Sequence, residues 1–315
     1  MISARKLRGA GFSGLRVVGD VHGEAEAFEA AIAGAEALGL FVIQLGDLVD
    51  YGPDSPGVLR RAFAMLDAQR GVFLLGNHEH KLRRALIGHA SAKLFVAPEG
   101  LGRTLEQLQA APDATALTAR AVAEIARAPA WLRLGQAMFI HAAYHDAMLF
   151  RAPPEDAGTR RPDGPLSRAL YGEVTGQRGP DGYPMRATRW VGRIPHGITT
   201  YVGHDNRSTN GRPHEMRGAL GGRAIFLDTG AGKGGALAWI DLPFEALERL
   251  DNGLAVRVHQ RIGDHIRFRP IPNFLDRDFI GDGAGCRQHL ATTFELADNT
   301  GDGLEHHLPC FCYPA

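Results

Sequence analysis

The sequence contains few cysteines, and they do not suit a disulfide framework. Only three of the 315 residues are cysteines, and all of them, Cys286, Cys310 and Cys312, lie near the C-terminal end. Disulfide-stabilised proteins usually carry an even number of cysteines, because every bridge consumes two. The scarcity of cysteine therefore argues against an oxidising compartment, and we expect a cytoplasmic protein.

The sequence also lacks a long apolar run and an excess of charge of either sign. No stretch has the length of a membrane span or of the apolar part of a secretory signal. The 35 Lys and Arg side chains balance the 35 Asp and Glu side chains, so no broad basic surface for nucleic acids or membranes is expected. What is present, 44% hydrophobic and 22% charged residues, is typical of a soluble globular protein with a sizeable core.

Residues 15–77 alternate between short apolar runs and segments with apolar residues at helical spacing. The apolar runs are LRVVGD (15–20), FVIQLGD (41–47) and GVFLLGN (71–77). Helical spacing is clearest between Phe28 and Leu38 and again after Ser55, where Pro56 suits the first position of a helix. Strands that alternate with helices predict an α/β fold in which neighbouring strands are parallel.

Further apolar runs follow at 137–143, 199–204, 224–230 and 236–242. Between them, residues 151–165 are polar and rich in proline, and residues 205–222 are also irregular, so both are expected to be loops. After about Pro243 the pattern indicates no chemistry.

Side chains that can bind metal ions stand at the ends of five apolar runs. They are Asp20 and His22, then Asp47, then Asn77 and His78, and later His141 and His204. The ligand crevice of an open α/β sheet lies beyond the carboxyl ends of its strands, so we expect these side chains to meet at one edge. A carboxylate buried there costs free energy unless a positive charge offsets it. The pattern therefore predicts a shared cation site.

The predicted ligands are oxygen and imidazole groups without any thiolate. This donor set favours Mn, Fe, Zn, Ni or Mg over a structural zinc site. A carboxylate shared by two metals about 3.5–4 Å apart is typical of two-metal hydrolysis, in which a bridging water becomes the nucleophile at neutral pH. We therefore expect two divalent metal ions, and manganese is the favoured metal for both.

Several motifs together resemble the calcineurin-like metallophosphoesterases, in their phosphoprotein-phosphatase branch. They are GDVHG (19–23), GDLVD (46–50), GNHE (76–79), the His in FIHAA and the His in YVGHD. Longer stretches, such as ALYGEVTGQRGPDGYPMR (169–186) and LDTGAGKGGAL (227–237), are similar to the phosphatase module of bacterial polynucleotide kinase-phosphatases. The resemblance covers about residues 15–243 and implies a four-layer αββα sandwich with the metals at one sheet edge.

The resemblance also implies a metal-ligand set. The first metal would be held by Asp20, His22 and Asp47, and the second by Asp47, Asn77, His141 and His204. Asp47 would bridge the two ions.

The same resemblance implies catalytic roles for two further residues. His78 would contact the phosphoryl group and protonate the leaving oxygen, and Asp50 would orient the His78 imidazole. The chemistry agrees, because a leaving alkoxide needs a proton and a carboxylate partner fixes the tautomer of a histidine. Asp228 lies where the family carries a functional acidic residue, and we expect it to contact substrate.

Tyr51 departs from the family pattern, which has arginine in the sequence VDRG. A tyrosine hydroxyl cannot bind a terminal phosphate bidentately as a guanidinium does. We therefore expect weakened hydrolysis of monoesters or a preference for diesters, unless a nearby arginine replaces the missing charge. The candidates are Arg83, Arg84, Arg189 and Arg193.

Another glycine-rich segment looks like a phosphate-binding loop but lacks an essential residue. In GAGKGG (230–235), Gly234 stands where a Ser or Thr would bind magnesium, so a kinase activity is not expected.

These observations divide the chain into three parts. We expect a basic N-terminal segment (1–14), a metallophosphoesterase domain (15–243) and a C-terminal extension of unknown role (244–315). Within the domain, residues 151–198 are expected to cap the site and shape specificity.

The predicted activity is metal-dependent hydrolysis of phosphomonoesters or phosphodiesters without a covalent enzyme intermediate. The substrate suggested by the resemblance is a nucleotide or polynucleotide end, although zero net charge argues against tight polynucleotide binding. Hydrolysis of phosphoproteins or of dinucleoside polyphosphates is the main alternative. A protein that kept the fold only to bind a partner is an alternative of another class.

Overall fold

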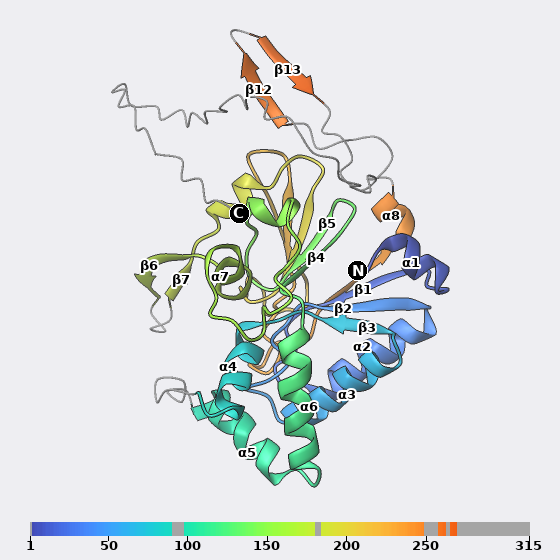
Figure 1. Ribbon diagram of the computed structural model, residues 1–315, viewed down its shortest axis with the longest axis vertical. Helices are drawn as coiled ribbons and strands as arrows, with labels where there is room; N and C mark the ends of the chain where they lie inside the picture. The colour runs from blue at the N-terminus through green and yellow to red at the C-terminus, as the bar shows by residue number, and fades with distance from the viewer. Residues whose placement is uncertain (1, 90–97, 180–183, 249–257, 263–264, 270–315) are drawn as a thin grey trace, which may run out of the picture. The chain divides into compact units, whose positions relative to one another are not determined.

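A computed structural model describes residues 2–89, 98–179, 184–248, 258–262 and 265–269. The chain forms two compact units, Met1–Leu254 and Ala255–Ala315 (Figure 1). In the second unit, strand β12 (Val258–Ile262) pairs antiparallel with β13 (His265–Arg269). Most of the predicted C-terminal extension, with its three cysteines, lies outside the described residues, so the three-part division of the chain stays a prediction.

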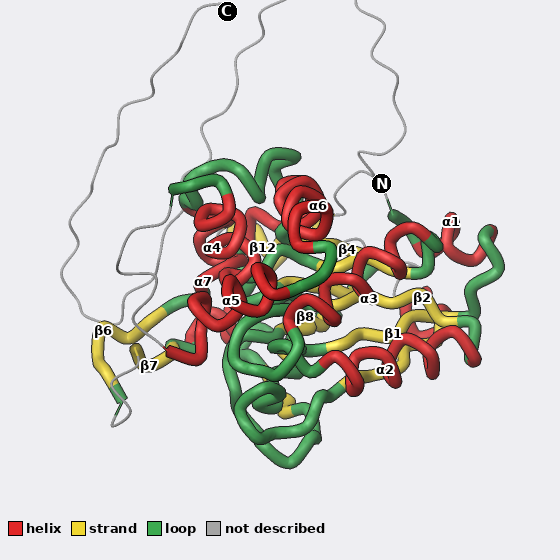
Figure 2. The backbone as a smooth tube through the Cα atoms, turned by 90° about the horizontal axis from the view of Figure 1, so that it is seen from below, coloured by secondary structure: helices red, strands yellow, loops and turns green. Residues whose placement is uncertain are grey.

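The first sheet has the strand order β11-β1-β2-β3. Its strands are β1 (Gly14–Val18), β2 (Leu40–Gln44), β3 (Gly71–Phe73) and β11 (Trp239–Pro243). The first three are mutually parallel, as the alternation of strands and helices predicted, and β11 closes the edge beside β1 in the antiparallel direction. Helices α2 (Ala25–Ala37) and α3 (Ser55–Asp67) are the connections between these strands and pack against them (Figures 1 and 2).

The second sheet has the order β4-β5-β8-β10-β9. Its strands are β4 (Trp131–Leu134), β5 (Ala137–Ile140), β8 (Thr199–Val202), β9 (His214–Arg217) and β10 (Arg223–Phe226). The three central strands are parallel, and both edge strands are antiparallel to their neighbours. Strand β9 lies inside the segment that was expected to be a loop. The sequence did not indicate this strand because its residues, HEMR, are mostly polar, and in the structure they are mostly exposed.

The alternation of side chains along the strands creates two apolar layers. One cluster joins residues of both sheets, including Val17 of β1, Ile43 of β2 and Phe139 of β5, and fills the space between the sheets. The intervening residues, such as Val18 and Ile140, belong to a second cluster that also contains helical residues. Side chains of a strand point alternately to its two faces, so each sheet is buried on both sides. The predicted αββα sandwich is confirmed.

The remaining helices surround this framework. They are α1 (Ala4–Gly9), α4 (Asn77–Leu86), α5 (Arg103–Ala110), α6 (Ala114–Arg127), α7 (Gly164–Tyr171) and α8 (Phe244–Glu248). Strand β6 (Val174–Arg178) and strand β7 (Pro184–Arg186) form an exposed antiparallel pair. None of the helices in the described ranges combines the length and the hydropathy that a membrane span requires.

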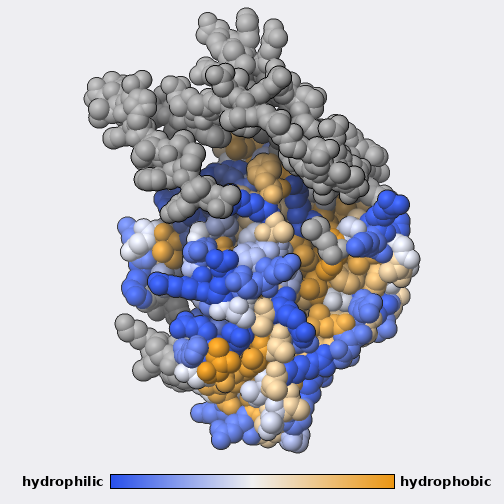
Figure 3. All heavy atoms as spheres, viewed as in Figure 1, coloured by the Kyte–Doolittle hydropathy of each residue, from blue (hydrophilic) through white to orange (hydrophobic). Residues whose placement is uncertain are grey.

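The face of the molecule in Figure 3 shows hydrophilic side chains over much of the described surface, with hydrophobic areas between them. The large apolar side chains that are exposed belong to separate elements and loops. They include Leu38, Phe150, Val174, Met185, Leu220 and Trp239.

Candidate metal centre

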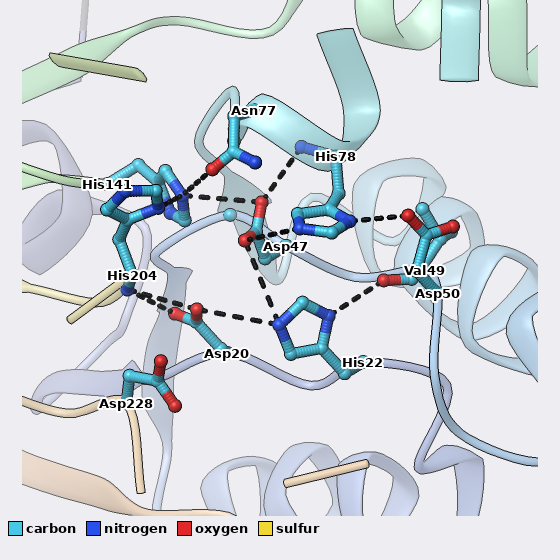
Figure 4. Close-up of polar contacts among 12 residues, drawn as sticks. Asp20, His22, Asp47, Val49, Asp50, Asn77, His78, His141, His204 and Asp228 are labelled. Carbon is cyan, nitrogen blue, oxygen red and sulfur yellow. Dashed lines mark hydrogen bonds and ion pairs between the residues drawn. The ribbon is translucent and has the colours of Figure 1, made fainter. Parts of the chain in front are cut away.

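The predicted site residues lie at the carboxyl ends of the parallel strands of both sheets. Asp20 and His22 follow β1, Asp47 follows β2, and Asn77 and His78 begin α4 just after β3. From the second sheet, His141 follows β5, His204 follows β8 and Asp228 follows β10. Figure 4 shows that these side chains gather around Asp47.

The backbone at this edge adopts an uncommon conformation. Six non-glycine residues with positive φ are found in the described part of the chain, and five of them belong to the site. They are His22 (45°), Asp47 (58°), Asp50 (75°), Tyr51 (64°) and His204 (62°). A non-glycine residue in the left-handed region costs about 1–3 kcal/mol, and such strain concentrates at functional sites. The fold therefore holds these side chains in position against the local preference of the backbone.

The imidazole of His22 presents an unprotonated nitrogen to two carboxylates. Its Nδ1 lies 2.8 Å from the Val49 carbonyl oxygen, which can only accept a hydrogen bond, so Nδ1 carries the proton. Burial and the charge of His78 lower the pKa of His22 to about 3, which leaves Nε2 with its lone pair. This nitrogen is 3.9 Å from Asp20 Oδ2 and 3.8 Å from Asp47 Oδ2. A lone pair that faces two carboxylate oxygens suits a cation between them.

The second half of the site repeats this arrangement around His141. The Nδ1 atom of His141 is 2.9 Å from the Leu45 carbonyl oxygen, and its Nε2 faces Asn77 Oδ1 at 3.0 Å and Asp47 Oδ1 at 3.3 Å. Burial would lower the pKa of His141, but the charge of Asp47 raises it above its usual value. The position beside Nε2 thus attracts positive charge, whether from a proton or from a metal ion. A histidine that donates one ring N–H to a backbone carbonyl and aims the other nitrogen at the site is typical of metal ligands.

His204 completes this second group. Its Nδ1 lies 3.1 Å from His141 Nε2, and its backbone N–H donates to both carboxylate oxygens of Asp20. The buried Nε2 of His204 has no hydrogen-bond partner among the described residues. Burial lowers the pKa of His204 well below its usual value, with contributions from His141 and Arg186, so its imidazole is neutral and able to act as a ligand.

Negative charge accumulates around these imidazoles. Burial raises the pKa of Asp20 well above its usual value, and the charges of Asp228 and Asp47 raise it further. Burial likewise raises the pKa of Asp228. Burial would raise the pKa of Asp47 too, but His141 and His78 hold it well below its usual value. Divalent cations offset such crowded carboxylates, so the donor set fits metal ions with oxygen and imidazole ligands.

Two groups of ligand-type side chains share one carboxylate. His22, Asp47 and His78 form one group, and Asp47, His141 and His204 form the other, with ligand atoms within 4.8 Å of one another in each. Asp47 is common to both groups, as expected of a bridging ligand. The structure brings His78 rather than Asp20 into the first group, although Asp20 lies directly beside it.

His78 is held by a chain of hydrogen bonds that reaches α5. Its Nδ1 lies 2.5 Å from Asp50 Oδ2, and its Nε2 is 3.7 Å from Asp47 Oδ2. The other oxygen of Asp50 accepts a hydrogen bond of 2.6 Å from the Thr104 hydroxyl, and the Asp50 backbone N–H donates to the same hydroxyl at 3.0 Å. Burial would raise the pKa of Asp50, but its hydrogen bond with His78 lowers it, so the carboxylate stays ionised. Asp50 can therefore keep the His78 ring in one orientation.

Glu79 holds the metal-binding loops together, and the sequence analysis did not identify it. It is fully buried, and its carboxylate accepts backbone hydrogen bonds from Asp47 at 2.8 Å, Leu48 at 2.7 Å and Gly76 at 3.1 Å. Burial and the charge of Asp47 raise the pKa of Glu79 to about 7. The fourth position of the GNHE motif was the available signal, because a buried acid there requires donors nearby.

The proposed replacement arginines have other partners. Arg189 forms an ion pair with Glu173 while its side chain remains 76% exposed, and Arg193 pairs with Asp146. Arg83 and Arg84 donate to backbone carbonyl oxygens, at 3.3 and 3.4 Å. In the part of the chain that the structure describes, none of the four forms a hydrogen bond or ion pair with the metal-binding side chains. A substrate contact of Arg189 stays a prediction.

Two cationic residues to which the sequence analysis gave no role at the site act on the cluster. Arg186, at the end of β7, is half-buried and donates to the Tyr171 carbonyl oxygen at 3.2 Å, and its charge contributes to the low pKa of His204. Lys233 lies in the loop after β10, and its ammonium nitrogen is 4.2 Å from the centre of the Tyr51 ring.

Comparison with known proteins places the first part of the chain in context. Residues 15–111 match the calcineurin-like phosphoesterase family. The chain is 29% identical over 211 residues to an asymmetrical bis(5′-nucleosyl)-tetraphosphatase of Halalkalibacterium halodurans, covering 63% of this chain and 74% of that protein. A protein of the same name from Geobacillus thermodenitrificans is 29% identical over 205 residues, with the same coverage. A symmetrical bis(5′-nucleosyl)-tetraphosphatase from Acidovorax is 43% identical over 76 residues, 24% of this chain and 26% of that protein.

The solved structures that match this chain are more distant in sequence than these relatives. A serine/threonine phosphatase from Saccharomyces cerevisiae superposes with a TM-score of 0.46 at 13% identity, covering 73% of this chain and 79% of that one. A metallophosphoesterase from Sphaerobacter thermophilus gives a TM-score of 0.39 at 15% identity, with 74% and 85% covered.

Proposed function

We propose that this chain, a metal-dependent phosphoester hydrolase with a calcineurin-like metallophosphoesterase domain, acts on dinucleoside polyphosphates. The observation that carries the hydrolase assignment is the pair of buried imidazoles, His22 and His141, whose Nδ1 atoms face backbone carbonyl oxygens and whose Nε2 atoms both face the Asp47 carboxylate. The choice of substrate is supported by the bis(5′-nucleosyl)-tetraphosphatase relatives, which span 63% of this chain. The nucleotide or polynucleotide end suggested by the motifs becomes the competing substrate.

We assign two metal positions to the cluster. One ion would be held by Asp20, His22 and Asp47, and the other by Asp47, Asn77, His141 and His204. Bound divalent ions would supply a Lewis acid that lowers the pKa of water and offsets the charge of the phosphoryl group. We propose manganese for both positions, with Fe, Zn, Ni and Mg as the competing metals.

The residues of the chain then have separate tasks. Asp50 accepts a hydrogen bond from the Nδ1–H of His78 and so directs Nε2 toward the cluster, where it can donate a proton to the leaving oxygen. Glu79 fixes the backbone on both sides of Asp47. The buried Asp228 would contact the substrate; one of its carboxylate oxygens accepts a hydrogen bond from the Gly230 backbone N–H at 3.0 Å.

A substrate panel tests the proposal. The manganese-loaded full chain should release nucleotides from diadenosine tetraphosphate faster than it hydrolyses a 3′-phosphate oligonucleotide, a 2′,3′-cyclic nucleotide or a phosphopeptide. Asp47→Ala should abolish turnover of every substrate. Faster hydrolysis of the oligonucleotide or the phosphopeptide would assign the substrate differently. A wild-type chain that binds metal but turns over none of them, including a generic aryl phosphate, would support the binding-protein alternative.

A further inference from the structure

The loop after β10 reaches the metal cluster through closely packed glycines. In GAGKGG (230–235), Gly230, Gly232 and Gly234 all have positive φ, at 81°, 74° and 88°. A Cβ atom on Gly232 would lie 2.4 Å from the backbone oxygen of His22 and 2.6 Å from its Cβ, so only glycine allows this approach. The backbone just before Lys233 is therefore held in place, because Gly232 packs against His22, a predicted ligand of the first metal.

Tyr51 connects Lys233 to two histidines of the site. The Tyr51 ring meets the His22 ring edge to face, with centroids 4.9 Å apart, and lies 5.5 Å from the His78 ring. The Lys233 ammonium lies over the same ring, 4.2 Å from its centroid. Cations within about 6 Å of an aromatic centroid are attracted by the negative face of the ring. Tyr51 thus holds the ammonium beside the His22 half of the cluster.

Lys233 places a positive charge beside the metal cluster. The Lys233 side chain is exposed, and in the described ranges no carboxylate forms an ion pair with it. Burial raises the pKa of both Asp20 and Asp228, and the positive charge of Lys233 partly offsets that rise. An ammonium that lies beside the cluster and forms no ion pair with a carboxylate in the described ranges can bind an anionic phosphate.

We propose that Lys233, held over the Tyr51 ring, is the cation that binds the phosphate of the substrate on the His22 side of the cluster. This inference rests on the proposed function, since it assigns a phosphate contact within the same site. An arginine at position 51, as in the VDRG sequence, would place a second cation against Lys233. Tyrosine removes that repulsion and adds an aromatic face, so the positive charge is supplied by a different loop.

Phosphate binding by the Lys233 ammonium differs from binding by the arginine of VDRG. A guanidinium binds two phosphate oxygens at once in a fixed plane, whereas an ammonium is a compact charge that can donate in several directions. Lys233 should therefore contribute to affinity for phosphate without selecting strictly between terminal and internal phosphate groups. Lys233 would therefore supply the positive charge that the arginine of VDRG provides in the family. Neither Arg189 nor the other three candidate arginines would be needed for it.

Phosphate binding measured apart from turnover tests the inference. Inorganic phosphate is titrated calorimetrically into the manganese-loaded full chain and into Lys233→Gln, Lys233→Arg, Tyr51→Leu and Tyr51→Phe. The control is Lys6→Gln, since Lys6 is an exposed lysine on α1, outside the metal centre. Lys233→Gln should weaken phosphate binding about tenfold and raise KM for an aryl phosphate more than it lowers kcat, because one charge-assisted contact is lost.

The other variants separate the two partners. Lys233→Arg should restore most of the affinity, and Tyr51→Leu should weaken binding about threefold, by more than Tyr51→Phe, because only phenylalanine keeps the ring. Lys6→Gln should behave as wild type. Manganese binding should be unchanged or tighter in Lys233→Gln, since a nearby positive charge is removed.

Wild-type phosphate affinity in Lys233→Gln would overturn the inference, as would weaker manganese binding in that variant. Equal effects of Tyr51→Leu and Tyr51→Phe would refute the role of the ring. These outcomes are independent of the substrate panel: the proposed function fails if diadenosine tetraphosphate is not hydrolysed, whereas this inference fails if phosphate binding ignores Lys233.

Discussion

The substitution Asp50→Asn tests whether His78 acts as a proton donor. The substitution keeps the shape of the side chain but removes the negative charge that faces His78 Nδ1 at 2.5 Å. The hydrogen bond from Thr104 Oγ1 to Asp50, 2.6 Å long, can still be made to an amide oxygen. The change therefore acts on the charge beside His78 more than on the packing around it.

The magnitude follows from the kind of hydrogen bond that is lost. A hydrogen bond to a charged group contributes about 1.5–3 kcal/mol and a neutral one about 0.5–1.5 kcal/mol. The difference of about 1–1.5 kcal/mol corresponds to roughly a tenfold change in rate. It should appear only when the reaction needs the proton, that is, when the leaving group is a poor one.

The assay measures kcat of the manganese-loaded chain for two substrates that differ in the leaving group. We expect Asp50→Asn to slow hydrolysis of an alkyl phosphate about tenfold and that of a nitrophenyl phosphate about twofold. Thr104→Val, which keeps the charge of Asp50 but removes its hydroxyl partner, should give the same pattern with a smaller effect. Equal slowing of both substrates would refute the reasoning, because it would mean that Asp50 supports the fold or the metals instead of the proton transfer.

Two further predictions concern residues that hold the site in place. Glu79→Gln should lower the free energy of unfolding of the metal-free chain by about 1–3 kcal/mol, because an amide cannot accept all three backbone hydrogen bonds and turns a donor toward another donor. Urea unfolding measures this loss, and an unchanged midpoint and slope would contradict it. Gly232→Ala should destabilise the chain by about 1–3 kcal/mol more than Gly234→Ala: both have positive φ, but an added Cβ at Gly232 meets His22 whereas at Gly234 nothing lies within 4 Å. Equal losses for these two variants would argue against the close approach.

Much of this site could be predicted because its residues follow strands in a regular way. Asp20, Asp47 and Asn77 each stand at or just beyond the end of an apolar run, and parallel strands bring such positions to one edge. The motifs around these residues also placed His141 and His204, which belong to the second sheet. The parallel strands of the first sheet followed from the alternation of strands and helices, whereas the two-sheet sandwich was predicted from the family resemblance.

The supporting contacts could not be predicted, because they join positions without a fixed spacing. Thr104 meets Asp50 across 54 positions of the chain, and no local pattern marks that threonine as a partner. Lys233 lies beside Tyr51 only because the glycines around it allow the loop to pack against His22. Strand β9 was missed for a different reason: an exposed edge strand of polar residues carries no apolar alternation.

The central claim is that Asp47 joins two metal ions. Electron paramagnetic resonance of the manganese-loaded full chain tests it most directly, because two Mn²⁺ ions that share a carboxylate are magnetically coupled. We predict a coupled spectrum for the wild type that is lost in Asp47→Ala. A spectrum of isolated ions in the wild type, or a coupled spectrum that survives in Asp47→Ala, would contradict the account.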